Sequence, residues 1–386
     1  MHRTLSLLAA LTTTLTLSAH AATAERLIVS DAATNELSVL DAATGTRTAR
    51  FSTPGPLSGL YAGPGGTLGY ALHRDADRVT VLHSGLDSVD HGDHRDLVIG
   101  APHVLATLNV GQQPTHFFTH EGRIVIFNDR SGTVAVFGET LLGKTNDMQI
   151  VKVAQPDHGA PVLIGDVLLS GYLRLNRVDA YDVTTGALLG PVKDGCPALH
   201  GEAVRASTAT FGCTDGVLEV TVQGKTFTSR KIANPAGTPE GTRVGTVAAH
   251  EKSPALYGNF GTGLVRWEPG GAALTPVPLS AAPLKFTFAP DGQRLLVLTA
   301  DGQLHALDAR TGRVLRSAAL VPTHNAADKA AVRPTFTLGE TRAYVTSPAT
   351  GEVIGVNLTD LSVQARMNVG GKPALIAVTT ASGEQH

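Results

Sequence analysis

Histidine is the residue type in this sequence whose number and placement indicate chemistry. The chain of 386 residues contains 15 histidines, and six of them fall in the segment from His83 to His120. Within that segment, the run Asp90-His91-Gly92-Asp93-His94-Arg95-Asp96 combines imidazole and carboxylate groups. Both groups are zinc ligands in proteins. Short tracts of this kind bind many metals loosely, so the run alone indicates metal binding without identifying the metal.

A second set of histidines recurs at one spacing. His116, His158 and His200 are each 42 residues apart, and each closely follows a proline. If the chain is built from repeats of that length, the three imidazoles occupy one equivalent position and converge. Convergent neutral nitrogen donors, about 2.0–2.1 Å from a tetrahedral ion, suit Zn²⁺. We therefore predict a zinc site at these three histidines, with a fourth ligand from Asp157, Asp93 or a histidine of the acidic run.

The rest of the sequence predicts strands to position these residues. Short alternating apolar runs, rich in β-branched residues and bounded by Gly, Asp, Asn and Pro, recur along the chain, for example at 27–29, 79–82, 124–127, 295–298 and 343–345. Such runs are typical of strands. The 42 glycines and 21 prolines suit many tight turns. We expect an all-β protein.

Two markers give the repeat length. The turn Asp-x-x-Thr-Gly starts at Asp41, Asp182 and Asp308. A series of eight strand-opening positions runs from Pro56 to Pro373, with proline at every place except the fifth, where Arg243 stands. Its seven steps average about 45 residues, the length of a four-stranded propeller blade. We predict a single β-propeller domain over residues 26–386, with eight blades, or seven if residues 208–253 are merged with a neighbour. A last strand near 374–379 would complete the first blade, so that the N- and C-terminal strands close the ring.

The acidic histidine run lies in an insertion. The step from Pro56 to Pro114 is the longest, and its extra residues, at about 86–103, join the third and fourth strands of a blade. Such a loop opens on the face opposite the loop that leads into the first strand, where the three spaced histidines lie. A flexible arm of this length extends up to roughly 60 Å and can fold back. The sequence therefore leaves open whether the two histidine groups form one metal site or two.

The N-terminus indicates export. Residues 1–21 hold an early Arg3, an apolar stretch and the small-x-small sequence Ala19-His20-Ala21, a signal-peptide pattern that allows cleavage after Ala21 or Ala24. No later run is long enough to span a membrane. In an oxidising compartment, Cys196 and Cys213 are expected to form a disulfide.

The balance of charges argues against nucleic acid as a partner. The 31 Lys and Arg residues nearly match the 33 Asp and Glu residues, so no broad basic field attracts nucleic acid. We expect a monomer that binds no nucleic acid.

Several segments together resemble a known family. The His-Gly-Asp-His run, QPTHFFTHEGRIVIFND, CPALHGEA, FGCTDGVL and RVGTVAAH are similar, in this order, to the periplasmic zinc metallochaperones of the AztD type. The resemblance covers most of residues 26–386. It implies a propeller that holds zinc in the periplasm and passes it to the zinc solute-binding protein of an ABC importer. The family's histidine and aspartate loop corresponds to His91, Asp93 and His94.

The leading hypothesis is thus a zinc carrier and not an enzyme. A rival is a zinc hydrolase in which three histidines leave a water on the metal and Glu202 acts as general base. No Ser/His/Asp arrangement and no H-E-x-x-H motif supports that rival. A second rival is a metal-free propeller for protein interactions. Four protein ligands would favour the carrier, and three ligands with a water near Glu202 would favour the hydrolase.

Overall fold

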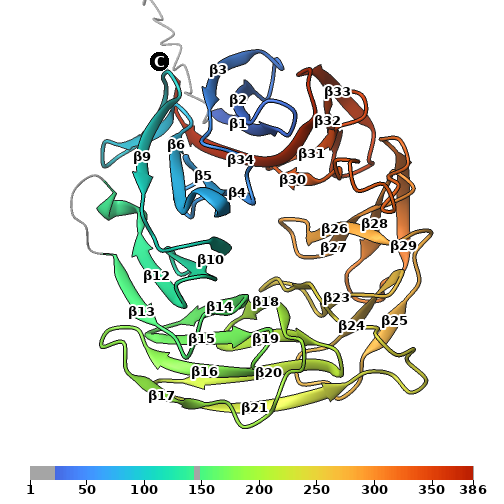
Figure 1. Cartoon of the computed structure of the whole chain (residues 1–386). Helices are drawn as coiled ribbons and strands as arrows, with labels where there is room; N and C mark the ends of the chain where they lie inside the picture. Colours follow the sequence, from blue (N-terminus) through green and yellow to red (C-terminus); the bar gives the residue numbers. More distant parts are fainter. Residues whose placement is uncertain (1–21, 143–147, 386) are drawn as a thin grey trace, which may run out of the picture.

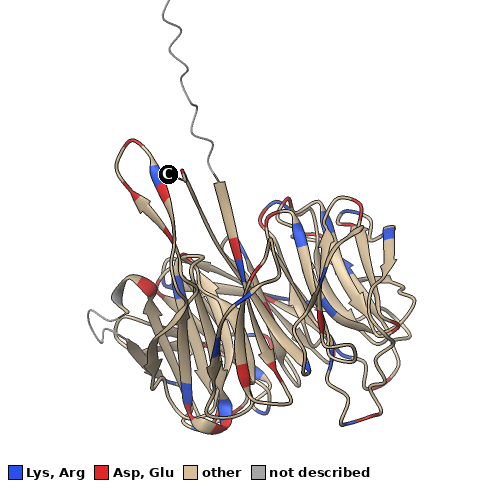
Figure 2. Cartoon of the chain, turned by 90° about the horizontal axis from the view of Figure 1, so that it is seen from above, with Lys and Arg blue, Asp and Glu red and all other residues tan. Residues whose placement is uncertain are grey.

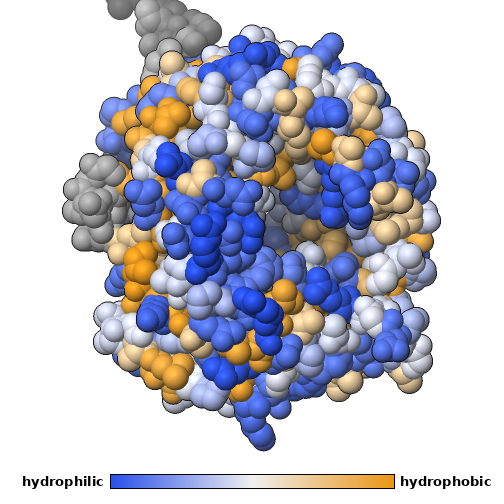
Figure 3. Space-filling model, in the orientation of Figure 1, coloured by the Kyte–Doolittle hydropathy of each residue, from blue (hydrophilic) through white to orange (hydrophobic). Residues whose placement is uncertain are grey.

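Eight four-stranded antiparallel sheets form a ring (Figure 1). The computed structural model describes residues 22–142 and 148–385. The space-filling view shows a hollow at the centre of the ring, with hydrophilic side chains around it (Figure 3). The eight-bladed propeller is therefore confirmed. The seven-blade alternative is wrong, because residues 208–253 span parts of two separate sheets.

The first four blades in chain order share one plan, in which four antiparallel strands follow one another from the centre of the ring to its rim. From inner to outer strand they are β34 (Pro373–Gly383), β1 (Ala22–Asp31), β2 (Glu36–Asp41) and β3 (Arg47–Ser52); β4 (Gly59–Ala62), β5 (Leu68–His73), β6 (Arg78–His83) and β9 (His103–Leu108); β10 (Pro114–His120), β11 (Arg123–Asn128), β12 (Thr133–Gly138) and β13 (Gln149–Lys152); and β14 (Gly159–Ile164), β15 (Val167–Tyr172), β16 (Arg177–Asp182) and β17 (Leu188–Pro191).

The other four blades follow the same plan. They are β18 (His200–Arg205), β19 (Thr208–Cys213), β20 (Gly216–Gln223) and β21 (Thr226–Ala233); β22 (Val247–Ala248), β23 (Leu256–Phe260), β24 (Gly263–Trp267) and β25 (Thr275–Val277); β26 (Pro283–Phe288), β27 (Arg294–Thr299), β28 (Gln303–Asp308) and β29 (Val314–Ala319); and β30 (Phe336–Leu338), β31 (Arg342–Ser347), β32 (Glu352–Asn357) and β33 (Val363–Asn368). Two 3₁₀ turns, η1 (Arg74–Ala76) and η2 (Glu139–Leu141), follow β5 and β12.

The two ends of the chain close the ring in one blade. Strand β34 is the inner strand there and pairs antiparallel with β1, from Ala22 opposite Gly383 to Asp31 opposite Pro373. This closure confirms the prediction that terminal strands complete the first blade. The inner edge of each sheet then faces the central hollow, where it is protected from edge-to-edge association.

The core lies between the faces of neighbouring blades. In one cluster, Val162 and Leu169 of one blade pack with Phe211 and Leu218 of the next, and all four side chains are fully buried. Outer strands such as β3 and β29 are largely exposed, whereas the middle strands are buried on both faces. The inner strands are thereby held rigidly around the hollow, and residues at their starts become fixed points for a site.

The insertion between β6 and β9 is an ordered hairpin. Strands β7 (Leu86–Asp90) and β8 (Arg95–Ile99) pair with each other. The Leu97 amide donates a hydrogen bond to the Glu384 carbonyl, at 2.9 Å, and the Glu384 amide donates to the Arg95 carbonyl, at 2.6 Å. Figure 2 shows the hairpin rising beside the C-terminus and β1. The flexible arm expected from the sequence is therefore wrong for these residues, because backbone bonds tie the hairpin to the end of β34.

The described residues include no helix that is long and apolar enough to cross a membrane. The predicted signal peptide, residues 1–21, lies outside the described residues, which begin with β1 at Ala22.

Candidate metal centre

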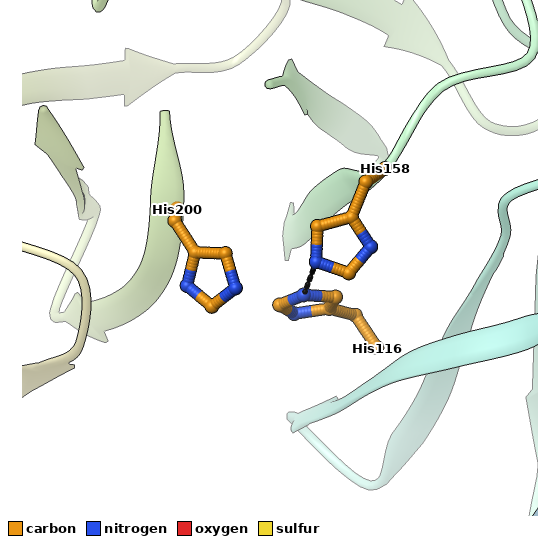
Figure 4. A group of neighbouring side chains, drawn as sticks. All are labelled: His116, His158 and His200. Atoms are coloured by element: carbon orange, nitrogen blue, oxygen red, sulfur yellow. Dashed lines mark hydrogen bonds between the residues drawn. The ribbon is translucent and has the colours of Figure 1, made fainter. Parts of the chain in front are cut away.

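Three histidines from consecutive blades converge at the start of the inner strands. His116 lies in β10, His158 directly precedes β14, and His200 opens β18. Each ring offers one nitrogen, and these nitrogens all lie within 4.8 Å of one another. The Nε2 atoms of His116 and His158 are 3.2 Å apart. Figure 4 shows the three rings turned toward a common point.

The three histidines lie at the starts of their inner strands, as their spacing predicts, although the pairing differs in detail. His116 pairs with Phe127, the fifth residue of β11, just after a bulge that follows Pro114. His200 pairs with Gly212, the fifth residue of β19, and a bulge follows His200 itself. His158 lies directly before β14, which begins with Gly159 opposite Tyr172. His116 and His200 thus have equivalent pairing partners, and His158 joins them from just outside its strand.

A glycine is needed beside His200. Gly201, in the bulge of β18, has φ of 74°, a conformation that glycine adopts without strain. A Cβ atom there would lie 2.6 Å from the carbonyl oxygen of Gly245. That carbonyl is the acceptor for Nδ1 of His200, at 2.6 Å. The missing side chain therefore allows the approach that orients this imidazole.

The Nδ1 atom of each histidine forms a hydrogen bond with an acceptor outside the cluster. Nδ1 of His116 donates to Glu202 Oε1 at 3.2 Å, and Nδ1 of His158 donates to Asp129 Oδ2 at 2.9 Å. The acceptor for His200 is the Gly245 carbonyl. Since these acceptors have no hydrogen to give, Nδ1 carries the proton in each neutral ring and the Nε2 lone pair faces the common point. This is the usual arrangement around a metal-ligating histidine.

The cluster fits a zinc ion. Two Nε2 lone pairs at 3.2 Å repel each other unless a proton or a cation lies between them. Ligands at 2.0–2.1 Å around a tetrahedral ion are separated from each other by about 3.3 Å, which matches this distance. The distance between His116 and His158 is therefore the one that a tetrahedral zinc ion requires, and His200 offers a third nitrogen within 4.8 Å of both.

Two carboxylates set the electrostatics of the cluster. Burial by itself would lower the pKa of His116, but the charge and hydrogen bond of Glu202, aided by Asp129, raise it above its usual value. Burial lowers the pKa of His200, and the neighbouring imidazoles act in the same direction. Burial opposes ionisation of Asp129, yet His158 and Arg74 lower its pKa. The outer carboxylates thus supply negative charge beside a site for a divalent cation.

Asp157 is not available as the fourth ligand, contrary to one expectation. Its side chain is buried, and Oδ1 accepts from Nε of Arg174 at 3.1 Å. Oδ2 accepts from the amides of Arg174 and Leu175, at 3.0 and 3.2 Å. This carboxylate closes the turn that carries His158. Among the described residues, the group within 4.8 Å consists of the three histidines.

The histidines of the acidic run form a separate group on the hairpin. The rings of His91 and His94 stack with centroids 5.2 Å apart. Their Nε2 atoms lie 3.1 and 3.2 Å from the two carboxylate oxygens of Asp96, and His94 Nδ1 lies 2.8 Å from Asp93 Oδ1. The hydrogen bond to Asp93, against a smaller effect of burial, raises the pKa of His94.

The two histidine groups lie at opposite ends of the inner strands. The hairpin is bonded to the last residues of β34, whereas His116 and His200 lie at the starts of β10 and β18. An inner strand of six residues is about 20 Å long. The structure thus brings His91, Asp93 and His94 together, but not with the three spaced histidines.

The predicted disulfide is present. Cys196 and Cys213 are bonded and fully buried within the cluster between two blades. The bond ties the loop that leads into β18 to the end of β19. It therefore braces the segment that carries His200.

Comparison with known proteins finds a zinc chaperone that is similar in sequence and in structure. No family model matches the sequence. The zinc chaperone AztD of Citrobacter koseri is 26% identical over 330 residues, which cover 82% of this chain and 77% of AztD. Its crystal structure has a TM-score of 0.84 to this chain at 25% identity, covering 95% of this chain and 100% of the AztD chain. The resemblance to AztD is confirmed.

Two other solved structures are similar to this chain to different degrees. The apo form of C. koseri AztD has a TM-score of 0.82 at 24% identity over 95% of this chain. The dihydro-heme d1 dehydrogenase NirN has a TM-score of 0.62 at 11% identity over 91% of this chain. NirN shares the fold alone, whereas AztD shares fold and sequence along most of the chain.

Proposed function

We propose that this protein is a zinc chaperone that holds Zn²⁺ between His116, His158 and His200. The observation that supports it best is the orientation of the three rings, each with Nδ1 on an outer acceptor and Nε2 toward the others. The similarity to AztD, named a zinc chaperone, supports the same metal and role. Imidazole nitrogens also suit copper and nickel, so selectivity would rest on the tetrahedral spacing and on metal availability.

The position of Glu202 favours a chaperone over a hydrolase. A general base must reach the water that it activates. Oε1 of Glu202 instead accepts the hydrogen bond from Nδ1 of His116, at 3.2 Å. In this geometry Glu202 orients a ligand and supplies charge.

We propose a second, weaker zinc site on the hairpin, at His91 and His94 with Asp93 and Asp96. Both imidazoles already face carboxylate oxygens at hydrogen-bond distance. Zinc would have to displace protons there, and His91 and Asp93 are exposed, so exchange would be faster than at the half-buried three-histidine cluster. The hairpin group is suited to capturing or releasing metal, and the three-histidine cluster to holding it.

The receiving protein would be the zinc solute-binding protein of an ABC importer, in the periplasm. Export by the N-terminal signal fits the disulfide between Cys196 and Cys213. Cleavage after Ala21 would keep all of β1, whereas cleavage after Ala24 would remove the residues that pair with Ala381, Ser382 and Gly383. We therefore place the cleavage after Ala21.

A transfer experiment tests the function. Zinc-loaded protein is mixed with increasing concentrations of a metal-free zinc solute-binding protein, and in parallel with a small chelator of similar affinity. Direct transfer predicts a rate that rises with the concentration of the acceptor protein and exceeds the rate to the chelator. A rate equal to spontaneous dissociation in both arms would contradict the chaperone function, although it would leave zinc binding intact.

A further inference from the structure

The three histidines occupy only one arc of the ring, and basic side chains occupy the next. The blades of β22, β26 and β30 follow those of the histidines in chain order. Arg243 precedes β22, Lys285 lies in β26, and Arg333 precedes β30. We call Arg243, Lys285 and Arg333 the cationic arc.

Lys285 has the strand position that His116 has in its own blade. In β26 a bulge follows Pro283, and Lys285 pairs with Leu298 just after it. His116 follows the bulge of β10 in the same way. The Nζ atom of Lys285 lies 5.7 Å from the centre of the Phe336 ring, on the inner strand of the next blade. Lys285 therefore extends along the inner wall toward the segment that carries Arg333.

Lys285 and Arg333 lie on the same part of the inner wall, because Phe336, whose ring Lys285 contacts, is three residues after Arg333. Burial lowers the pKa of Lys285 to about 8, and the charge of Arg333 acts in the same direction. An ammonium group that is partly buried beside another cation is destabilised, and a bound anion would relieve both effects.

Arg243 joins the cationic arc to the histidine cluster. Its side chain folds against Gly245, since a Cβ atom on Gly245 would lie 3.3 Å from Nε of Arg243. Gly245 supplies the carbonyl acceptor of His200. The charge of Arg243 is one cause of the lowered pKa of His200, after burial and the two other imidazoles. The positive charge thus begins directly beside the metal centre.

Among the residues that the structure describes, no carboxylate forms an ion pair with these cations. Within residues 22–142 and 148–385, the ion pairs of the structure include none with Arg243, Lys285 or Arg333. Asp301, in the turn after β27, bonds instead to Thr299 and Gln303. On the histidine side, by contrast, Arg74 pairs with Asp129 at 3.4 Å.

We propose that Lys285 and Arg333 bind a small multivalent oxyanion, a dicarboxylate or a tetrahedral anion such as sulfate, and that Arg243 adds positive charge on the side toward the metal centre. Guanidinium groups match two oxygens of such an anion at once, and the ammonium group adds a point charge. The same cations repel Zn²⁺, so this site is separate from the metal centre and goes beyond the proposed function. Its ligand would carry negative charge into the end of the hollow where zinc is held.

Calorimetry on the metal-free protein tests the proposal. Sodium sulfate and sodium succinate are titrated separately at constant ionic strength near neutral pH. We expect saturable binding of at least one anion, and the tighter one identifies the class. Lys285→Met and Arg333→Met should each weaken it about tenfold or more, because each removes a charged hydrogen-bond donor. The control Arg310→Met, at an exposed turn, should bind as wild type does.

A second measurement on wild type avoids any folding defect of the variants. With ¹⁵N-labelled lysine, the titration of the Lys285 Nζ group is followed by NMR without and with the tighter anion. Binding predicts an upward shift of its pKa. The proposal would be overturned by the absence of saturable binding of both anions, by equal binding in Lys285→Met and wild type, or by an unchanged titration. Because no zinc is present, each outcome is independent of the zinc chaperone function.

Discussion

The Nδ1 atom of His158 lies 2.9 Å from Oδ2 of Asp129, a buried carboxylate at the end of the neighbouring blade's second strand. Asp129 follows β11, and its amide donates to the Gln113 carbonyl at 2.9 Å, which places it beside the start of β10. This contact crosses between two blades. It fixes the ring of His158 so that Nε2 faces His116.

The outer carboxylates should control zinc affinity. Asp129→Asn and Glu202→Gln each remove a charge that orients a ligand, and we expect each to weaken zinc binding about 10- to 100-fold. Competition with a chromophoric chelator measures the affinity. The control Asp166→Asn removes an exposed carboxylate that pairs only with Arg123. Wild-type affinity in both outer-carboxylate variants would show that these contacts have no role in metal binding.

Acid should release the metal. A ligating histidine must be neutral, and Glu202 raises the pKa of His116 in spite of its burial. As pH falls, a proton therefore occupies His116 earlier than it would an ordinary histidine, and zinc must displace it. We expect affinity to fall steadily below about pH 7 and zinc to be lost near pH 5. Chelator competition across this range measures the effect, and equal affinity at both ends would exclude histidine ligation.

The hairpin should hold its metal independently of the three-histidine cluster. The double variant His91→Ala/His94→Ala should lose the weaker zinc equivalent and keep the tighter one, because the two groups lie at opposite ends of the inner strands. Calorimetric titration with zinc distinguishes the two. Loss of the tighter equivalent would instead show that both groups contribute to one site. His324→Ala serves as the control.

The disulfide should stabilise the fold. In the chain-entropy model, the bond between Cys196 and Cys213, which are 17 residues apart, contributes about 3 kcal/mol. Cys196→Ser/Cys213→Ser should therefore lower the free energy of unfolding by about that amount, with a further cost for burying hydroxyl groups. Urea denaturation measures the change. Since the bond braces the loop before His200, the zinc affinity of the folded double variant should also fall, and an unchanged affinity would contradict the bracing role.

The ring of eight blades could be predicted because it follows from local chemistry. Each blade repeats strands of alternating polarity, turns such as the one at Asp41, and an opening proline, so the period is visible along the chain. The closing strand near 374–379 followed from the same count, and β34 occupies that place. The pairing of Cys196 with Cys213 needed only an oxidising compartment and an even number of cysteines.

The fine geometry of the candidate site could not be predicted in the same way. A bulge before His116 and another after His200 shift the pairing of β10 and β18 by one residue, and the repeat length of the sequence does not reveal such bulges. Asp129 and Gly245 come from the ends of other strands, so only strand pairing reveals them as partners. For Asp129, the pairing of β10 with β11 sets Asn128 opposite Pro114, and the Asp129 amide then bonds to the Gln113 carbonyl.

The most direct test of the central claim is the zinc content of the purified protein after exhaustive dialysis, measured beside His116→Ala, His158→Ala and His200→Ala. His324→Ala is the control. We expect one tightly held zinc ion per chain in wild type and control, and its loss from each of the three variants while their circular dichroism remains that of a folded β protein. Full zinc content in all three variants would contradict the central claim.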